Sequence, residues 1–482
     1  MMNKEKTIGW NFDNSYSNLP KSFIYEISPV PVKRPELVIL NHDLADQMGL
    51  NFSNVDNEQL AKMFSGNLLP KGSKSLAQAY AGHQFGHFTM LGDGRAVLLG
   101  EHISKSNQRL DIQFKGSGQT PFSRNGDGRA ALGPMLREYL ISEAMHSLNI
   151  PTTRSLAVVK TGENVIREKP LQGAILTRVA SSHIRVGTFQ FIRTRENLDE
   201  LNTLVNYTIK RHYPEISKSK NNAYDLLSKL IDKQIELVVN WMRVGFIHGV
   251  MNTDNMAISG ETIDYGPCAF MDSYNLGTCF SSIDHMGRYA YGNQPAITKW
   301  NLARFAECLL TLINPNKDDA LKMATELIDK FDKIYEEKWF NMMKSKLGLI
   351  GDDKEDNLII FELLEIMKKQ ELDYTNTFLF LMDHEIDDKK SYQNEEFDNW
   401  KMKWQKRLTK DSKNLMELNN PVIIPRNHNV ENVLKSAENN DLTPFNDLLQ
   451  ALKNPYTNQK VLTKYQSPPP KSDEKYQTFC GT

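Results

Sequence analysis

The stretch HGVMNTDN, His248 to Asn255, is the part of the sequence that decides the fold. The residues before it, DLLSKLIDKQIELVVNWMRVGF, place apolar side chains three or four positions apart, which predicts a helix that runs into a loop. Nine positions after Asn255 the chain reads Asp264-Tyr265-Gly266. We therefore expect two polar turns close together, with a histidine, an asparagine and an aspartate at fixed spacing.

This spacing fits the register of the protein-kinase catalytic motifs, H-R-D-x-x-x-x-N followed by D-F-G. His248, Asn255 and Asp264 occupy matching positions, but the position of the catalytic aspartate holds Val250, which cannot accept a proton. Asp254 lies four residues later and could orient or deprotonate a substrate hydroxyl. Alternatively, its side chain only caps the turn or coordinates a metal ion. The stretch thus indicates either a silent kinase or an enzyme with different chemistry.

Two strands and a helix are predicted upstream of this loop. AVLLGEHI (Ala96–Ile103) and LDIQFKG (Leu110–Gly116) are apolar runs joined by a polar turn, which is typical of consecutive strands. GPMLREYLISEAMHSL starts with Gly133-Pro134, and a proline in the first turn favours the start of a helix. RSLAVVKT and LQGAILTRV predict further strands, so the segment indicates a sheet with one inserted helix.

Lys115 ends the second strand and Glu138 lies on the predicted helix. In kinases a strand lysine pairs with a helix glutamate in this order and holds the nucleotide phosphates. Either residue alone is more often an ordinary surface charge. The ordered pair ahead of HGVMNTDN favours the ion pair.

We expect an α+β chain of two-lobed, protein-kinase-like fold. Its parts are an N-terminal extension over residues 1–75, a β-rich lobe over 76–194, a mostly helical lobe over 195–465 with the catalytic and metal loops, and an extended tail over 466–482. Short strands around Met256–Ile258 and Thr262–Ile263 are predicted to frame the D-Y-G turn.

The bulk properties exclude several classes of protein. The 482 residues include 58 Lys and Arg against 59 Asp and Glu, so there is no basic footprint for nucleic acid or an anionic membrane. No signal peptide and no apolar run of about 18 residues is apparent. The four cysteines lack C-x-x-C spacing, which argues against a structural zinc site. We expect a cytoplasmic monomer.

Phosphate binding is indicated by glycines and arginines. Three G-x-G units lie close together, and glycine lets backbone N–H groups approach phosphate oxygens; they are Gly92-Asp93-Gly94, Gly116-Ser117-Gly118 and Gly126-Asp127-Gly128. One unit alone usually marks a turn, whereas three close together favour phosphate binding. Arg178 and Arg185 could both bind phosphates, or form ordinary ion pairs. No P-loop motif is present, which excludes a P-loop NTPase.

Asn255 and Asp264 are candidate metal ligands. An amide oxygen and a carboxylate suit Mg²⁺, which takes further oxygens from phosphates and water, and Mn²⁺ accepts the same ligands. An Asx-turn is the alternative for a loop asparagine. The surrounding motif favours metal binding, with His248 as a buried brace of the loop.

At this point the sequence resembles the selenoprotein O family, whose bacterial members are called YdiU. The resemblance runs from about Trp10 to the C-terminus. The segments that carry it are QAYAGHQFGHF, TMLGDGRA, QFKGSGQTPFSRNGDGRAALGPMLREYLISEA, LTRVASSHIRVGTFQF, HGVMNTDNMAISGETIDYGP and DHMGRYAYGNQP. These motifs are long and unusual, so chance agreement is not credible.

The resemblance implies a kinase-like enzyme that binds ATP in a flipped orientation and transfers AMP to Ser, Thr or Tyr hydroxyls of proteins, itself included. It places nucleotide contacts on Gly92, Gly94, Arg95, Lys115, Asp127, Gly128, Arg178, Arg185 and Asp264, the partner of the lysine on Glu138, the base on Asp254, and the metal ligands on Asn255 and Asp264. Some bacterial members are implied to use UTP with Mn²⁺ instead of ATP. In the flipped orientation Val250 is no longer where a base is needed.

The family also carries a cysteine or selenocysteine near the C-terminus, here Cys480. We hypothesise a reversible redox pair between Cys480 and Cys279 that tethers the tail. A thiol in the tail that has no partner is the alternative, and the sequence favours neither.

Three hypotheses follow for the function. The first is a protein adenylyltransferase, with UMP transfer as a variant. The second is a kinase with Asp254 as base, against which Val250 counts. The third is a pseudokinase that binds nucleotide as an interaction module, against which the intact Lys115, Asn255 and Asp264 count. Transfer of label from α- or γ-labelled ATP separates them.

Overall fold

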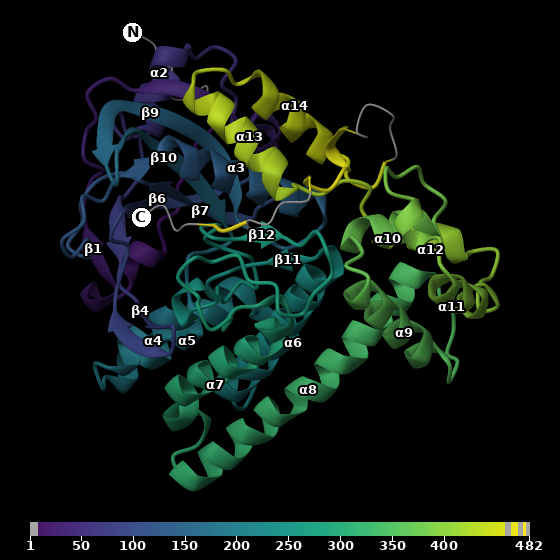
Figure 1. Ribbon diagram of the computed structural model, residues 1–482. Helices are drawn as coiled ribbons and strands as arrows, with labels where there is room; N and C mark the ends of the chain where they lie inside the picture. The colour runs from purple at the N-terminus through teal and green to yellow at the C-terminus, as the bar shows by residue number, and fades with distance from the viewer. Residues whose placement is uncertain (1–7, 458–463, 471–475, 479–482) are drawn as a thin grey trace.

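An antiparallel sheet of eight strands forms the first layer of the protein in the computed structural model, which describes residues 8–457, 464–470 and 476–478 (Figure 1). The strand order is β1-β3-β6-β7-β10-β9-β2, and β8 also pairs with β10. The strands are β1 (Ile24–Glu26), β2 (Glu36–Leu40), β3 (Leu76–Gln78), β6 (Ala96–Ile103), β7 (Arg109–Lys115), β8 (Ala130–Ala131), β9 (Arg154–Ile166) and β10 (Pro170–Ala180). Strands β1 and β2 come from residues 1–75, so that segment contributes directly to the sheet.

The pairing of β7 with β10 positions two of the predicted site residues. Leu176 lies opposite Lys115 and Arg178 lies opposite Gln113. Because side chains alternate between the faces of a strand, Lys115 and Arg178 lie on the same face as diagonal neighbours.

Helix α3 (Leu132–Ser147) covers this face of the sheet, and it matches the helix predicted from GPMLREYLISEAMHSL. Its side chains are buried on nearly every side, as expected for a helix inside a protein. Helices α13 (Asn427–Glu438) and α14 (Thr443–Leu452) return from the far end of the chain to lie against α3 (Figure 1), where Tyr139 meets Phe445. Glu138 is therefore held on a helix that is packed from both sides.

The helical part follows the sheet in the chain and supplies most of the remaining core. Helix α6 (Asn222–Val244) begins after Asn221, whose side chain accepts from the N–H of Tyr224, and is capped by Gly245 in the left-handed conformation. The other α-helices are α1 (His42–Met48), α2 (Asn57–Phe64), α4 (Val186–Arg193), α5 (Leu198–His212), α7 (Gln294–Ile313), α8 (Lys317–Leu347), α9 (Asp356–Lys369), α10 (Tyr374–Leu381), α11 (Glu395–Gln405) and α12 (Ser412–Asn419).

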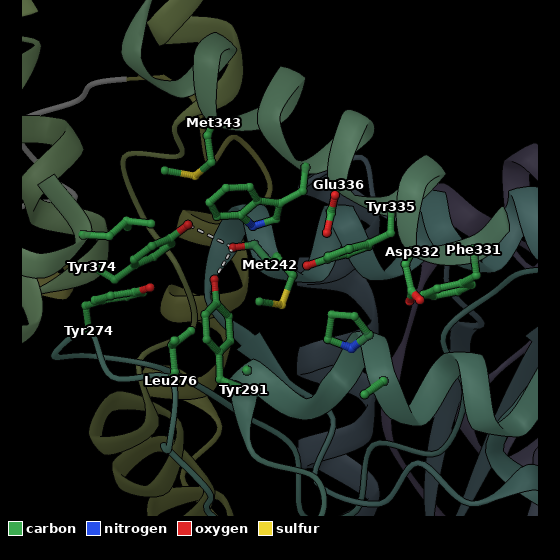
Figure 2. Close-up of a pocket in the computed structure, with 15 residues that line it drawn as sticks. Met242, Tyr274, Leu276, Tyr291, Phe331, Asp332, Tyr335, Glu336, Met343 and Tyr374 are labelled. Atoms are coloured by element: carbon green, nitrogen blue, oxygen red, sulfur yellow. Dashed lines mark hydrogen bonds between the residues drawn. The ribbon is translucent and has the colours of Figure 1, made fainter. Parts of the chain in front are cut away.

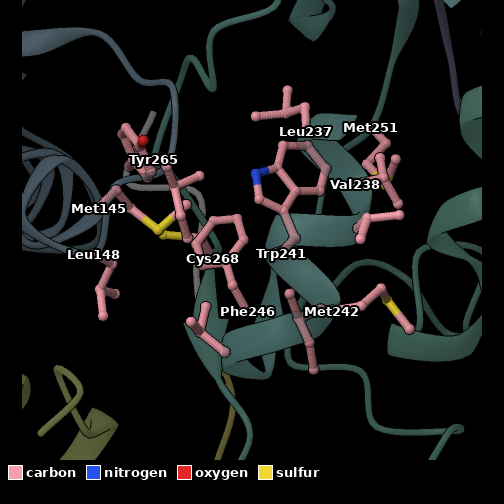
Figure 3. Packing of buried hydrophobic residues seen from close by; sticks show 14 of the residues in the cluster. Met145, Leu148, Leu237, Val238, Trp241, Met242, Phe246, Met251, Tyr265 and Cys268 are labelled. Carbon is pink, nitrogen blue, oxygen red and sulfur yellow. The ribbon is translucent and has the colours of Figure 1, made fainter. Parts of the chain in front are cut away.

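A continuous apolar core joins the two parts beneath the HGVMNTDN loop. Figure 3 shows Trp241 of α6 among buried residues that include Met145 from α3 and Phe246 from the short strand β11 (Phe246–Ile247), which pairs with β12 (Ala269–Phe270). The rings of Trp241 and Phe246 are 5.5 Å apart. The loop is thus anchored on packed side chains rather than on a surface turn.

The α+β fold class with the kinase-like order of elements is confirmed: lysine strand, glutamate helix, helical part, loop and D-Y-G turn. The prediction of short strands around residues 256–258 and 262–263 is wrong. Ala257 and Thr262 each form only an isolated bridge, to Arg185 and Thr152, because this segment pairs with the sheet side of the molecule instead of with itself. Among the described helices, none combines the length and apolar character needed to cross a bilayer.

Candidate active site

Five charged side chains meet where the sheet, α3 and the D-Y-G turn come together. We call Lys115, Glu138, Arg178, Arg185 and Asp264 the ion cluster. Lys115 Nζ lies 2.6 Å from Glu138 Oε2 and 2.7 Å from Asp264 Oδ1. Arg178 donates to the same two carboxylates at 2.6 Å each, and Arg185 reaches Asp264 Oδ2 at 2.9 Å. The strand lysine and the helix glutamate therefore form the pair that the sequence predicts.

The ion cluster keeps both of its carboxylates ionised. Burial alone raises the pKa of Asp264, but Arg178, Lys115 and Arg185 hold it well below its usual range. Burial opposes ionisation of Glu138 in the same way, and Arg178 and Lys115 lower the pKa of its carboxyl group. Three cations thus surround two carboxylates, which leaves positive charge for an anionic ligand such as a polyphosphate.

Asp264 adopts an unusual backbone conformation, with a φ of 65° in the left-handed region. Aspartate, asparagine and glycine are the residues that visit this region most readily. The conformation turns the chain sharply after Ile263 and directs the carboxylate of Asp264 into the ion cluster. Such conformations concentrate at functional sites because the surrounding structure must hold them.

Asp254 lies beside the ion cluster, on the single 3₁₀ turn Thr253–Asn255. The residue is 7% exposed, and its Oδ1 atom has no hydrogen-bond partner among the described residues. Arg185 donates to the backbone oxygen of Asp254 at 2.8 Å, not to its carboxylate. Burial raises the pKa of Asp254 to about 6 although Arg185 lowers it. A carboxylate of this kind is suited to take up a proton near neutral pH.

A hairpin that the sequence analysis did not identify as part of the site lies over this loop. Strands β4 (Ala81–Gln84) and β5 (His87–Met90) form it, and the N–H of His83 donates to Thr253 Oγ1 at 2.7 Å. A Cβ atom on Gly82 would lie less than 3.0 Å from Asp254 Oδ1, so only glycine allows this approach. In the sequence, the only sign of this hairpin was the dense spacing of glycine, histidine and phenylalanine in QAYAGHQFGHF. This spacing has neither a helix nor a strand period, so it predicts no element.

Tyr80 and Asp93 also lie beside the ion cluster, and the sequence analysis did not predict either as a site residue. The guanidinium of Arg185 lies 4.6 Å from the ring of Tyr80. Asp93 is buried, which raises its pKa to about 6, and its carboxylate accepts from the N–H of Gln78 and from Gln113. Because Gln113 in turn accepts from Arg178, Asp93 connects the first G-D-G loop to the ion cluster.

Gly92 and Gly94 of that loop are packed against Phe122 of the next glycine-rich segment. A Cβ atom on Gly92 would lie less than 3.0 Å from the ring of Phe122, and one on Gly94 would lie 2.7 Å from its backbone oxygen. These glycines therefore permit two loops to approach each other closely.

Asp127 and Gly128 lie further out, on the segment between β7 and β8. Asp127 pairs with Arg167 at 2.9 Å, and its side chain is 44% exposed. Gly128 has a φ of 65° and accepts from the N–H of Gly118. The structure does not bring Asp127 into the ion cluster. Arg95, in contrast, lines a cavity of about 390 Å³ together with Lys115 and Glu138.

The donor set beside Asp254 fits a divalent cation with oxygen ligands. The amide nitrogen of Asn255 donates to the backbone oxygen of Val250 at 3.0 Å, which leaves its oxygen for another partner. Asp254 Oδ1 is buried without a partner, and Asp264 supplies a second carboxylate. Within the described residues no group of three or more His, Cys, Asp or Glu forms a complete metal site. A cation here would need oxygens from a nucleotide, as Mg²⁺ usually does.

Cys480 lies outside the described residues, so its pairing with Cys279 stays a prediction. Cys279 is half-buried, and its thiol faces Asp284; burial and this carboxylate raise its pKa to about 11. The tail approaches the same segment, because Thr478 forms a parallel bridge with Ser281.

Comparison with known proteins gives a consistent result. The profile of the family described as "Protein adenylyltransferase SelO" matches residues 6–453. A "Protein nucleotidyltransferase YdiU" from Pelagibacter ubique is 65% identical over 482 residues, which cover 99% of this chain and 100% of that protein. The protein of the same name from Nitrosococcus oceani is 55% identical over 486 residues, with 99% of each chain covered.

Among solved structures, "ROP2 from Toxoplasma gondii: A virulence factor with a protein-kinase fold and no enzymatic activity" matches with a TM-score of 0.25 and 10% identity, over 68% of this chain and 86% of that one. The fold assignment rests on the geometry described above and not on this match.

Proposed function

The chain belongs to the SelO family of protein adenylyltransferases, and from this premise we propose that it transfers AMP from ATP to Ser, Thr and Tyr hydroxyls of proteins, itself included, and releases pyrophosphate. We place the reaction in the cytoplasm and assign it to a monomer. The nucleotide binds in the flipped orientation, with its α-phosphate next to Asp254.

Asp254 is the general base in this proposal. It takes the proton from the acceptor hydroxyl while the hydroxyl oxygen forms a bond to the α-phosphorus. The bond between the α-phosphorus and the bridging oxygen breaks, and pyrophosphate leaves with the electron pair. The observation that carries the proposal is the buried, unpartnered Oδ1 of Asp254 beside the ion cluster, in a loop whose kinase base position holds Val250.

The cations of the ion cluster stabilise the charge that develops on the polyphosphate. Lys115, Arg178 and Arg185 are fixed by Glu138 and Asp264 before the substrate binds, so little reorganisation is needed during the reaction. Arg95 lines the adjoining cavity and adds a further cation. Gly92, Gly94, Asp127 and Gly128 hold the glycine-rich loops that close over the nucleotide.

Asn255 and Asp264 would hold Mg²⁺ or Mn²⁺, with Asp254 close by. When bound, the metal ion neutralises phosphate charge and orients the α-phosphate. Lys115 contacts Oδ1 of Asp264 and Arg185 contacts Oδ2, so the carboxylate is fixed in direction.

Three labelled nucleotides test the proposal with purified protein, Mg²⁺ or Mn²⁺, and the Asp264→Asn variant as control. Label from α-phosphate-labelled ATP should appear on protein, and the variant should lose it. Transfer of only the γ-label would identify a kinase. Preference for α-labelled UTP with Mn²⁺ would identify UMP transfer, which the printed name of the relatives, nucleotidyltransferase, leaves open. Binding without transfer of any label would favour an interaction module.

A further inference from the structure

A cavity of about 340 Å³ lies in the helical part, between the end of α6, the start of α7 and one face of α8. Ligand pockets in proteins have volumes of about 300 to 1,000 Å³, so the space is sufficient for a small molecule. Its rim reaches the surface, because Leu276 is 48% exposed and the side chain of Asp332 is 63% exposed. None of its lining residues belongs to the ion cluster or to the loop of Asp254.

Two aromatic walls face each other across this cavity (Figure 2). Tyr274, Tyr291 and Tyr374 form one wall, with ring centroids 5.8 to 6.4 Å apart. Helix α8 contributes the other wall, where the rings of Phe331 and Tyr335 stack at 6.2 Å and Trp339 follows one turn later.

The hydroxyl groups in the walls differ in their partners. Tyr291 and Tyr374 donate to the backbone oxygen of Met242 at 2.7 and 2.9 Å. Figure 2 shows the hydroxyls of Tyr274 and Tyr335 directed into the space between the walls, where neither meets a hydrogen-bond partner among the described residues. The cavity therefore offers ring faces and two free polar atoms.

The charged side chains that line the cavity are negative, whereas Lys346 lies behind the wall, 5.0 Å from the ring of Tyr374. Its lining includes the carboxylates of Asp332 and Glu336 but no lysine, arginine or histidine. Asp332 pairs with Lys299 at 2.6 Å, whereas Glu336 has no ion-pair partner in the part of the chain that the structure describes. The backbone oxygen of Met242 belongs to the C-terminal end of α6, where the helix dipole is also negative.

Aromatic faces combined with an unpaired carboxylate bind cations that are too weakly hydrated to prefer water. We propose that this cavity is a binding site for a small organic cation with an alkylated ammonium group, held by the rings of Tyr335 and Trp339 and by the carboxylate of Glu336. An anion would meet no positive side chain among the described residues that line the cavity, and a metal ion would meet too few oxygen ligands.

The site lies behind the HGVMNTDN loop. Gln294 lies between the lining residues Gly292 and Pro295, and it accepts from the N–H of His248 at 3.0 Å and donates to the backbone oxygen of Phe246 at 3.0 Å. The cavity wall is thus continuous in sequence with a brace of the loop, although binding itself needs no nucleotide.

Choline and its neutral carbon isostere 3,3-dimethyl-1-butanol test the proposal, because they share shape and differ in charge. We expect calorimetry with the full chain to show saturable choline binding, and the isostere to bind at least about fivefold more weakly. Glu336→Gln should weaken choline binding about threefold, while the matched control Glu337→Gln, one residue further on α8, should leave it unchanged. Tyr335→Leu should weaken it further by removing a ring.

Equal binding of the two probes would overturn the proposal in favour of an apolar cavity. Absence of saturable choline binding by the folded wild-type protein would overturn it outright. If Glu337→Gln and Glu336→Gln weakened choline binding equally, the attraction would come from general surface charge and not from Glu336, and the proposal would be overturned. If Tyr335→Leu fails to fold, the exposed Glu336 still decides the outcome, since circular dichroism can verify that its variant is folded.

Discussion

The two ends of strand β7 carry buried charge clusters on the same face of the sheet, about 13 Å apart along the strand. Lys115 belongs to the ion cluster at one end. Asp111 at the other end belongs to what we call the anchoring network, which also contains Glu101, His183 and Arg211. Arg211 lies 2.6 Å from Asp111 and 3.2 Å from Glu101, and His183 donates to Asp111 at 3.0 Å.

The clusters differ in how fully their carboxylates are paired. Both oxygens of Asp111 accept hydrogen bonds, and Arg211 and His183 hold its pKa at about 2 although burial acts in the opposite direction. Burial lowers the pKa of His183 to about 4, so its ring is neutral near pH 7. Beside the ion cluster, Asp254 Oδ1 has no partner in the described part of the chain, and burial raises the pKa of the Asp254 carboxyl group to about 6.

The difference separates a structural role from the catalytic role that we propose for Asp254. A buried carboxylate whose oxygens are all paired contributes to stability and has nothing left to offer a substrate. A buried carboxylate with a free oxygen lowers stability and persists where a ligand or a proton completes its bonding. Removal of each group should therefore affect different measurements.

The largest effect is expected for Asp254→Asn. Loss of the proposed base should lower the rate of AMP transfer about 10³-fold, whereas the free energy of unfolding should stay the same or rise, because the buried Oδ1 makes no hydrogen bond within the described residues. Single-turnover transfer and thermal unfolding measure the two quantities. Asp232→Asn on the exposed face of α6 serves as control. Retention of the wild-type rate would remove Asp254 from the mechanism.

Asp111→Asn should show the opposite behaviour. It leaves Arg211 without its main anion, so the free energy of unfolding should fall by about 3 kcal/mol, while transfer per folded molecule stays near the wild-type rate. Urea denaturation gives the stability, and a rate corrected for the folded fraction gives the activity. A strong loss of activity without loss of stability would contradict the division of roles.

Gly82→Ala tests the close approach of the β4–β5 hairpin to Asp254. The added methyl group would displace the carboxylate, so we expect a rate about tenfold lower with nucleotide binding retained. In Gly277→Ala the new Cβ atom would have its nearest neighbour at 3.3 Å, which makes it the milder control. Equal effects of both changes would show that the hairpin does not position the base.

The pH dependence of transfer should reflect the pKa of Asp254, about 6. In the proposed mechanism the ionised carboxylate is the active form, so the rate should fall as pH drops through 6, to about one tenth of its plateau at pH 5. This limb should disappear from the residual activity of Asp254→Asn. A flat profile between pH 5 and 8 in the wild-type protein would indicate that another step limits the rate.

The smallest effect concerns Cys279 and Cys480. Because its pKa is raised to about 11, the Cys279 thiol should pair slowly at neutral pH and faster as pH rises. Peptide mapping after mild oxidation should give a linked Cys279–Cys480 peptide that disappears with reductant. Absence of this peptide would leave both thiols without a redox role.

Local signals in the sequence were sufficient for much of the fold. Strand β6 begins and ends at the predicted residues, Ala96 and Ile103, since its apolar run is bounded by turns. The Lys115–Glu138 pair was predictable because the order of strand lysine, helix glutamate and HGVMNTDN loop along the chain matches that of kinases. The hairpin over Asp254 was not, because its position depends on hydrogen bonds to Thr253, some 170 residues away in sequence. Long-range contacts of this kind leave no periodicity.

The backbone of Asp264 has a consequence for how this protein changes over generations. A left-handed φ of 65° is tolerated by asparagine and glycine, and each is one base change from an aspartate codon. A variant with either residue keeps its backbone unstrained while it loses the carboxylate that the cations surround. Loss of this carboxylate is therefore within reach of a single mutation, and its cost in stability would come from the cations left behind and not from the backbone.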